Sequence, residues 1–144
     1  MRAPTGASGR EHPVVRRDPW LNGLLGAIGK REAVDVQVTS RDVGDRTVVS
    51  VSGEIDVYTA AVLREQLGTL IEDGHHDVVV DLTDVRFMDS TGLGVLVGAL
   101  KKVRGFGGRL QLVIDSERLL KVFRITALTQ VFTIHETLDD ALAG

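Results

Sequence analysis

The chain has 144 residues, a length that fits one domain with an appendage of a few tens of residues. It contains no cysteine, which excludes disulfide frameworks, zinc–thiolate and iron–sulfur sites and thiol nucleophiles, and which fits a cytoplasmic protein. The net charge of −3 at pH 7 argues against a nucleic-acid binder, and no apolar run approaches the roughly 18 residues that membrane insertion requires.

Residues 1–33 differ in composition from the rest of the chain. They hold all three prolines, the only tryptophan and six of the seventeen Lys and Arg residues, but only three acidic residues. The remaining 111 residues contain eleven basic and seventeen acidic residues, a net charge of −6. We expect a flexible extension that is dispensable for folding and for partner binding. Its apolar stretch at residues 20–28 leaves open a helical turn, a docking patch, or a start of translation further along the chain.

A regular pattern begins at residue 34 and predicts one domain over residues 34–144. Two β-branched runs around Val38 and Val49 predict strands that are joined by a hairpin turn at residues 42–45.

An amphipathic helix and a buried strand follow. Thr59 is placed to cap the helix and Gly74 to end it, and the apolar residues between them recur at helical spacing: Leu63, Leu67, Leu70 and Ile71. Residues 77–82 form a near-continuous apolar run, which is typical of a strand buried on both faces.

The rest of the domain continues this alternation. It predicts a helix, a strand, a helix, a strand and a short terminal helix, around residues 93–103, 110–114, 119–123, 131–134 and 138–142. This order implies an α/β fold, with a mixed and largely parallel β-sheet packed with about four helices.

Several residues that could carry chemistry are better explained by structure. Asp81 and Asp84 flank the end of the buried strand, where acidic residues are usually solvated or form turns. His75 and His76 follow a helix end, and a solvated turn is expected because no third ligand stands at a useful spacing. The sequence has no dinucleotide fingerprint, phosphate loop or nucleophile elbow. We therefore expect no catalytic residue, no metal and no cofactor.

One segment remains, between the buried strand and the next helix: Phe87-Met88-Asp89-Ser90-Thr91-Gly92-Leu93-Gly94. Ser90 is placed as the N-cap of that helix, with its hydroxyl accepting a hydrogen bond from the amide of Gly92 or Leu93. An exposed Ser at a helix start is also a candidate for phosphorylation, which adds about −1.5 to −2 charges where free amides and the helix dipole tolerate an anion. Because Asp89 is already charged, the modification would change the surface more than the fold. On these residues alone both interpretations stay open.

A second motif precedes the buried strand: Gly53-Glu54-Ile55-Asp56-Val57-Tyr58-Thr59-Ala60. With the Ser90 segment, the pair Gly107-Gly108 and a closing Phe132-x-Ile134, it resembles the STAS domain of bacterial anti-sigma factor antagonists over roughly residues 34–144. In that family a GHKL-type serine kinase, which is also the anti-sigma factor, phosphorylates the Ser after the Asp, and a PP2C-type phosphatase reverses this. The resemblance implies an anti-sigma factor antagonist without enzymatic activity, whose unphosphorylated form binds the anti-sigma factor and releases a sigma factor.

The resemblance also implies which residues act. Ser90 matches the phosphorylated residue, and the expected partner-binding and switch residues are Asp56, Asp89, Ser90, Thr91 and Gly92. Thr91 stands where the family often has a second Ser, so it is an alternative acceptor.

One position departs from the family pattern. Ala127 stands where the family tends to have Gly, and would cost on the order of 1 kcal/mol if its φ is positive. A STAS accessory subunit of a transporter complex and a scaffold of a signalling assembly stay open as alternative functions.

Overall fold

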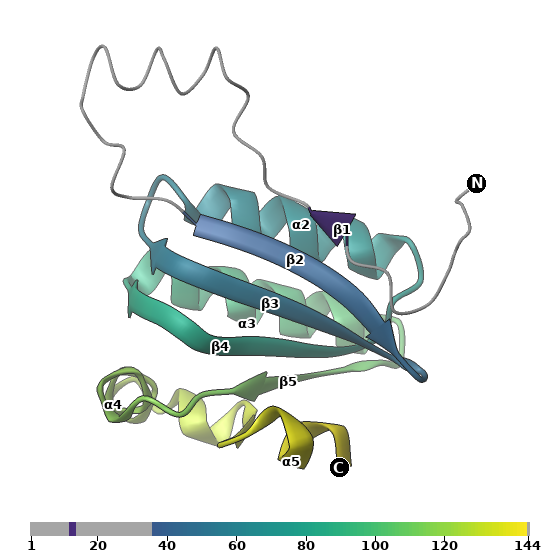
Figure 1. Ribbon diagram of the computed structural model, residues 1–144. Coiled ribbons are helices and arrows are strands. Elements are labelled where there is room, and N and C mark those ends of the chain that lie inside the picture. The colour runs from purple at the N-terminus through teal and green to yellow at the C-terminus, as the bar shows by residue number, and fades with distance from the viewer. Residues whose placement is uncertain (1–11, 14–35, 144) are drawn as a thin grey trace.

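The protein is represented by a computed structural model that describes residues 12–13 and 36–143 (Figure 1). Apart from His12 and Pro13, the predictions for the N-terminal extension lie outside the described residues. The elements, in chain order, are β1 (His12–Pro13), β2 (Val36–Val43), β3 (Arg46–Ile55), α2 (Ala60–Glu72), β4 (Asp77–Met88), α3 (Ser90–Gly105), β5 (Arg109–Val113), α4 (Glu117–Ile125), the 3₁₀ helix η1 (Leu128–Gln130), β6 (Thr133–His135) and α5 (Leu138–Ala143).

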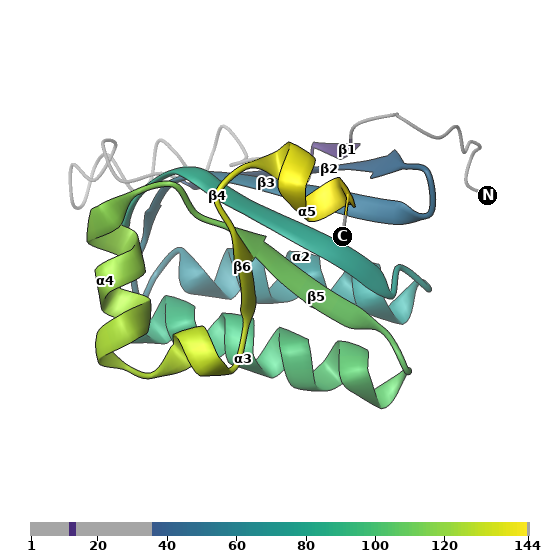
Figure 2. The same ribbon diagram turned by 90° about the horizontal axis from the view of Figure 1, so that it is seen from below.

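The six strands within the described residues form one mixed sheet in which spatial order follows chain order. β1, β2 and β3 pair antiparallel, whereas β3, β4, β5 and β6 pair parallel. Helices α2 and α3 cover one face of the sheet, and α5 lies on the other face (Figures 1 and 2). The predicted α/β fold with a largely parallel sheet is therefore confirmed. The short β1 pairs with Thr39 and Ser40 of β2, so two residues of the extension lie at the edge of the sheet.

The hydrophobic core lies mainly between the sheet and helices α2 and α3. β4 is buried on both faces, as the apolar run predicted: Val78, Val80 and Leu82 belong to this core, and Val79 packs with Val48, Val113 and Ala141 in a smaller cluster that includes α5. The predicted apolar residues of α2 are buried, except for the half-buried Leu70.

Strand β4 is six residues longer than predicted, because it continues beyond Leu82 to Met88. The apolar run ends at Leu82, but the strand goes on with polar residues at positions that face solvent. The expectation that Asp81 and Asp84 flank a strand end is therefore wrong, since both lie within β4. The Oδ1 atom of Asp81 accepts hydrogen bonds from the amide and the hydroxyl of Thr83, at 3.0 and 2.8 Å. The pairing with β3 changes register near this point, between Ser50 and Ser52.

The two histidines after α2 are half-buried and bonded, not solvated as predicted. Nδ1 of His75 lies 2.8 Å from the hydroxyl of Thr47, and Nε2 of His76 lies 2.9 Å from the carbonyl oxygen of Ile71. The ring of His76 also stacks on Phe106, with ring centroids 4.4 Å apart. The sequence did not show this because two of the partners, Thr47 and Phe106, come from β3 and from the turn after α3.

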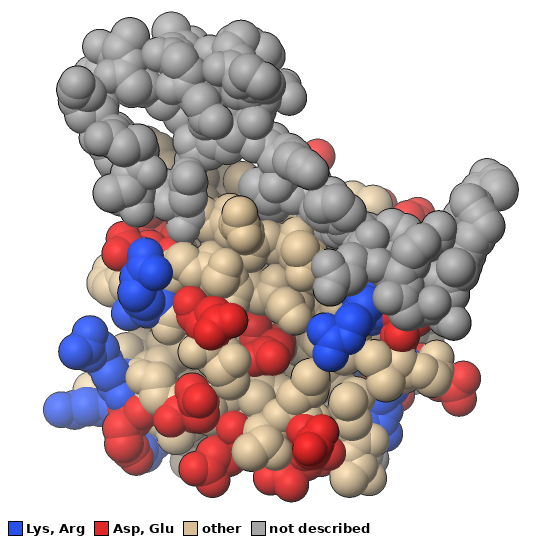
Figure 3. Space-filling view, viewed as in Figure 1, with Lys and Arg blue, Asp and Glu red and all other residues tan. Residues whose placement is uncertain are grey.

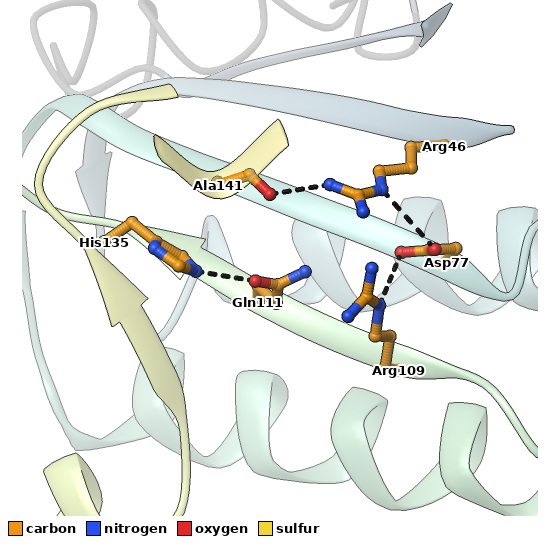
Figure 4. A network of polar contacts seen from close by, with 6 residues as sticks. All are labelled: Arg46, Asp77, Arg109, Gln111, His135 and Ala141. Atoms are coloured by element: carbon orange, nitrogen blue, oxygen red, sulfur yellow. Dashed lines mark hydrogen bonds and ion pairs between the residues drawn. The ribbon is translucent and has the colours of Figure 1, made fainter. Parts of the chain in front are cut away.

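A polar network joins α5 to the sheet (Figure 4). Arg46 donates a hydrogen bond from Nη1 to the carbonyl oxygen of Ala141 at 2.7 Å, and its Nε lies 3.6 Å from Asp77. Arg109 pairs with the same carboxylate at 3.2 Å. A guanidinium at the C-terminal end of a short helix is favourable because it meets the negative end of the helix dipole. Acidic side chains are prominent over the lower half of this face, where α5 lies (Figure 3).

The chain between α4 and β6 differs from the prediction of a strand at residues 131–134. Residues 128–130 form η1, and β6 begins two residues later than predicted. Ala127 connects α4 to η1 with φ 63° and ψ 18°, and it is the one described residue other than glycine with positive φ. The φ of Ala127 is thus positive, which is the condition under which alanine is expected to be less favourable than the glycine of the family pattern.

We expect Ala127→Gly to stabilise the protein by about 1 kcal/mol, because glycine adopts positive φ without steric strain. The free energy of unfolding from urea titration measures the change. The control is Ala61→Gly at an exposed position of α2, which should destabilise by about 0.5–1 kcal/mol. A loss of stability in Ala127→Gly as large as that in the control would contradict the strain.

Candidate functional site

Parallel pairing of β3 and β4 brings the two sequence motifs together. Ile55 at the end of β3 is the register partner of Met88 at the end of β4. Just beyond these ends, the amide of Asp89 donates a hydrogen bond to the carbonyl oxygen of Ile55 at 3.1 Å. The loop before α2 and the loop before α3 are therefore neighbours at the carboxyl ends of the two strands, the edge at which open α/β sheets usually bind their ligands.

Asp56 shapes the loop between β3 and α2. Its Oδ1 atom accepts hydrogen bonds from the amides of Tyr58 and Thr59, at 2.9 and 3.0 Å. The hydroxyl of Thr59 donates to the carbonyl oxygen of Glu54 at 2.8 Å and accepts from the amide of Asp56 at 2.9 Å. Thr59 occupies the N-cap position of α2 as predicted, but its hydroxyl closes the loop and does not cap the helix.

Asp89, not Ser90, is the N-cap of α3. Asp89 has an extended backbone with φ −97° and ψ −173°, and its Oδ1 accepts hydrogen bonds from the amides of Thr91 at 2.9 Å and Gly92 at 3.3 Å. Ser90 is the first residue of the helix itself. The prediction for Ser90 was therefore wrong by one position. Asp and Ser are about equally good N-caps, so their order alone could not decide which one caps.

Because Asp89 caps α3, the hydroxyl of Ser90 has no capping role. Ser90 is exposed, and within residues 36–143 its hydroxyl has no hydrogen-bond partner. Thr91 is half-buried. Of the two candidate acceptors, Ser90 is thus the more accessible hydroxyl.

The carboxylate of Asp89 and the N-terminus of α3 together determine the electrostatic environment of Ser90. Two amides of the first turn already bind the carboxylate of Asp89, so a phosphate on Ser90 would meet a helix N-terminus that is partly neutralised. It would lie next to that carboxylate, and the two negative groups would stand side by side on the surface. The helix dipole and the like charge act in opposite directions on such a phosphate.

Gly92 has a packing role in this site. A Cβ atom at this position would lie 2.7 Å from Cγ2 of Ile55 and 2.7 Å from Cγ of Met88. The first turn of α3 therefore rests directly on the ends of β3 and β4. Gly92 is buried, so it sets the position of Ser90 and does not itself present a binding group.

Three large apolar side chains near the two loops are exposed. The exposed fraction is 59% for Val57, 70% for Tyr58 and 50% for Phe87. Phe87 lies opposite Glu54 in the sheet, and Glu54 pairs with Arg86 at 3.8 Å. Val57, Tyr58 and Phe87 lie within the two sequence motifs but were not predicted as functional residues. Their signal was the position of bulky apolar residues at a strand end and in a turn, where burial is not expected.

We expect Asp89→Ala to destabilise the protein by about 1 kcal/mol, because two amides of α3 lose their acceptor. The shift of the urea midpoint measures this. Asp89→Asn, which keeps a side-chain oxygen at the cap, should lose only a few tenths of a kcal/mol. Equal losses in the two variants would show that charge, and not capping, is what Asp89 contributes.

Comparison with known proteins identifies the family of the domain. Residues 33–141 match the family model of the STAS domain. The chain belongs to the STAS domain family. This confirms the resemblance inferred from the two motifs.

The similar proteins are regulators. An anti-sigma-B factor antagonist of Bacillus subtilis is 48% identical over 101 residues, which are 70% of this chain and 88% of that protein. An anti-sigma-B factor antagonist of Staphylococcus epidermidis is 43% identical over 88 residues, 61% of this chain and 82% of that protein. The crystal structure of an anti-sigma factor antagonist from Mycobacterium paratuberculosis superposes with a TM-score of 0.72 at 33% identity, covering 76% of this chain and 92% of that one.

The STAS domain of this chain carries no helix, in the part that the structure describes, that is long and apolar enough to cross a membrane. Within the same residues, no three His, Asp or Glu side chains are grouped as a metal site would require.

Proposed function

We propose that this protein is an anti-sigma factor antagonist that is switched by phosphorylation of Ser90. The unphosphorylated form binds an anti-sigma factor that is also a serine kinase of the GHKL type, and this binding releases a sigma factor. Phosphorylation of Ser90 ends the binding, and a PP2C-type phosphatase restores it. The protein acts as a binding module and not as an enzyme.

One observation carries this proposal: the exposed hydroxyl of Ser90 stands at the first position of α3, beside the Asp56 loop and three exposed apolar side chains. Apolar side chains at the centre of an interface supply affinity, whereas charges tune it. A hydroxyl in the same surface can therefore switch binding without any change of fold.

The charge of the domain indicates the kind of partner surface. The domain at residues 34–144 carries seventeen acidic and eleven basic residues. Asp56 and Asp89 lie in the two site loops, and Asp115 follows the end of the neighbouring strand β5. A partner surface with an excess of Lys and Arg complements this edge and accelerates encounter.

Incubation with the cognate kinase and ATP should add one phosphate to the wild type and none to Ser90→Ala, as measured by intact mass. Thr91→Ala is the control, and it should be phosphorylated like the wild type because the exposed hydroxyl of Ser90 is retained. Phosphate on Ser90→Ala would assign the modification to Thr91 or to another residue. A wild type that neither binds nor is phosphorylated by the anti-sigma factor would favour the transporter or scaffold function instead.

A further inference from the structure

A groove runs between α2 and α3 on the outer surface of the helical layer, with a volume of about 470 Å³. Its floor is apolar and consists of the buried side chains of Leu67, Val95 and Ala99. Three glycines also line it: Gly68 from α2, and Gly94 and Gly98 from α3.

The two glycines of α3 are not required by the fold. A Cβ atom at Gly94 or at Gly98 would have no neighbouring atom within 4 Å, and neither residue has positive φ. Glycine inside a helix lowers stability relative to alanine, so these two positions weaken α3 without serving any internal contact. Their effect on the surface is to keep the groove open. Gly92, by contrast, is explained by lack of space, because a Cβ atom there would lie 2.7 Å from side-chain atoms of Ile55 and Met88.

The charges around the groove indicate an uncharged occupant. Arg64 and Glu65 lie on the wall formed by α2, and Lys102 of α3 pairs with Glu72 of α2 at 2.5 Å. The two positive and two negative side chains balance, so neither an acidic nor a basic segment has a net charge to bind. An apolar surface is the occupant that the floor favours.

Ser90 does not itself line the groove, but it lies on the same exposed face of α3 as two glycines that do. Ser90, Gly94 and Gly98 are spaced by four residues along α3 and are all exposed, so they lie on one face of the helix, one turn apart. A segment that lies on Gly94 and Gly98 therefore reaches Ser90. A phosphate on Ser90 would stand at the end of the groove, in the path of that segment.

We infer that the α2–α3 groove receives an apolar α-helix of the anti-sigma factor, whose end lies over Ser90. A helix fits because the groove is the seam between two packed helices, and because missing side chains let a third helix approach closely. This inference rests on the proposed function and adds where the partner lies. Phosphorylation of Ser90 then acts by blocking one end of the groove as well as by charge.

Gly98→Leu tests the groove without touching the switch site, because Gly98 lies two turns, or about 12 Å, from Ser90 along α3. The added side chain fills the groove, and the dissociation constant for the anti-sigma factor, measured by calorimetry on the full chain, should rise roughly 10-fold or more. Gly105→Leu is the matched control, since Gly105 lies on the same helix, has no atom within 4 Å of an added Cβ, and does not line the groove. It should bind within about twofold of the wild type.

The melting temperature separates binding from folding. Gly98→Leu should melt at the same temperature as the wild type or a few degrees higher, because leucine is the better helix former. Should leucine lower the melting temperature, Gly98→Ala adds only one methyl group to the groove and is expected to weaken binding by roughly threefold while stabilising α3.

The other outcomes are distinct. A wild type that does not bind the anti-sigma factor overturns the proposed function, and this inference with it. A wild type that binds and is blocked by phosphorylation, together with a Gly98→Leu variant of unchanged affinity, overturns the groove alone. Equal weakening in Gly98→Leu and Gly105→Leu also overturns it. Unchanged affinity of Gly98→Leu together with faster proteolysis of the apolar residues 20–28 also overturns the inference. The occupant of the groove is then this chain's own segment.

Discussion

Gly108→Ala should destabilise the protein by about 3 kcal/mol or more, because the new methyl group has no space. A Cβ atom at Gly108 would lie 2.0 Å from the backbone carbonyl oxygen of His76. The same carbonyl accepts a hydrogen bond from the amide of Arg109 at 2.8 Å, where β5 begins to pair with β4. Backbone cannot move aside as a flexible side chain can, so the start of this pairing has to open.

Thermal unfolding measures the effect, with an expected fall of the melting temperature by about 12 °C. Gly105→Ala is the control, because a Cβ at that exposed position meets nothing within 4 Å. The control should melt within a few degrees of the wild type. A Gly108→Ala protein as stable as this control would mean that the turn between α3 and β5 is free to shift.

Ser90→Asp should leave the fold intact and weaken binding to the anti-sigma factor by about 10- to 100-fold. An acidic residue in the first turn of a helix contributes about 0.3–1 kcal/mol of stability, so unfolding should change little. At the interface the new carboxylate stands beside Asp89, and two adjacent negative charges must lose water when the partner binds, a cost that exceeds their attraction to basic side chains of the partner.

Calorimetric titration of the anti-sigma factor measures the change in affinity. Ser90→Asn is the control, because it has the size of Asp without the charge and should bind far more tightly than Ser90→Asp. The phosphorylated wild type carries about twice the charge of a carboxylate and should bind more weakly still. If Ser90→Asp, Ser90→Asn and the phosphorylated protein all bind like the wild type, Ser90 is not the switch.

The architecture could be predicted from the sequence, because periodicity and chain order are local information. The apolar spacing of Leu63, Leu67 and Ile71 defines the buried side of α2, and all three are buried. The run at residues 77–82 predicted a strand covered on both faces, which the two clusters around β4 confirm. Gly74 ends α2 with φ 106°, as a glycine placed there predicts.

The details of the site, by contrast, depend on contacts between segments that are distant in the chain. Asp89 and Ser90 are both good caps, and the hydrogen bond from the Asp89 amide to Ile55 on the neighbouring strand accompanies the extended backbone that makes Asp89 the cap. The end of β4 at Met88 likewise depends on pairing with β3, since the residues after Leu82 do not form an apolar run. Neither pairing can be seen in the order of residues alone.

The glycines show the difference most clearly. Gly92, Gly98 and Gly108 share a residue type, and the residue type alone does not distinguish their structural roles. The structure separates them by what surrounds each one: strand ends against Gly92, a backbone carbonyl against Gly108, and open space at Gly98. Local sequence determines which conformations a residue favours, whereas its role depends on atoms from distant segments that only folding brings within a few ångströms.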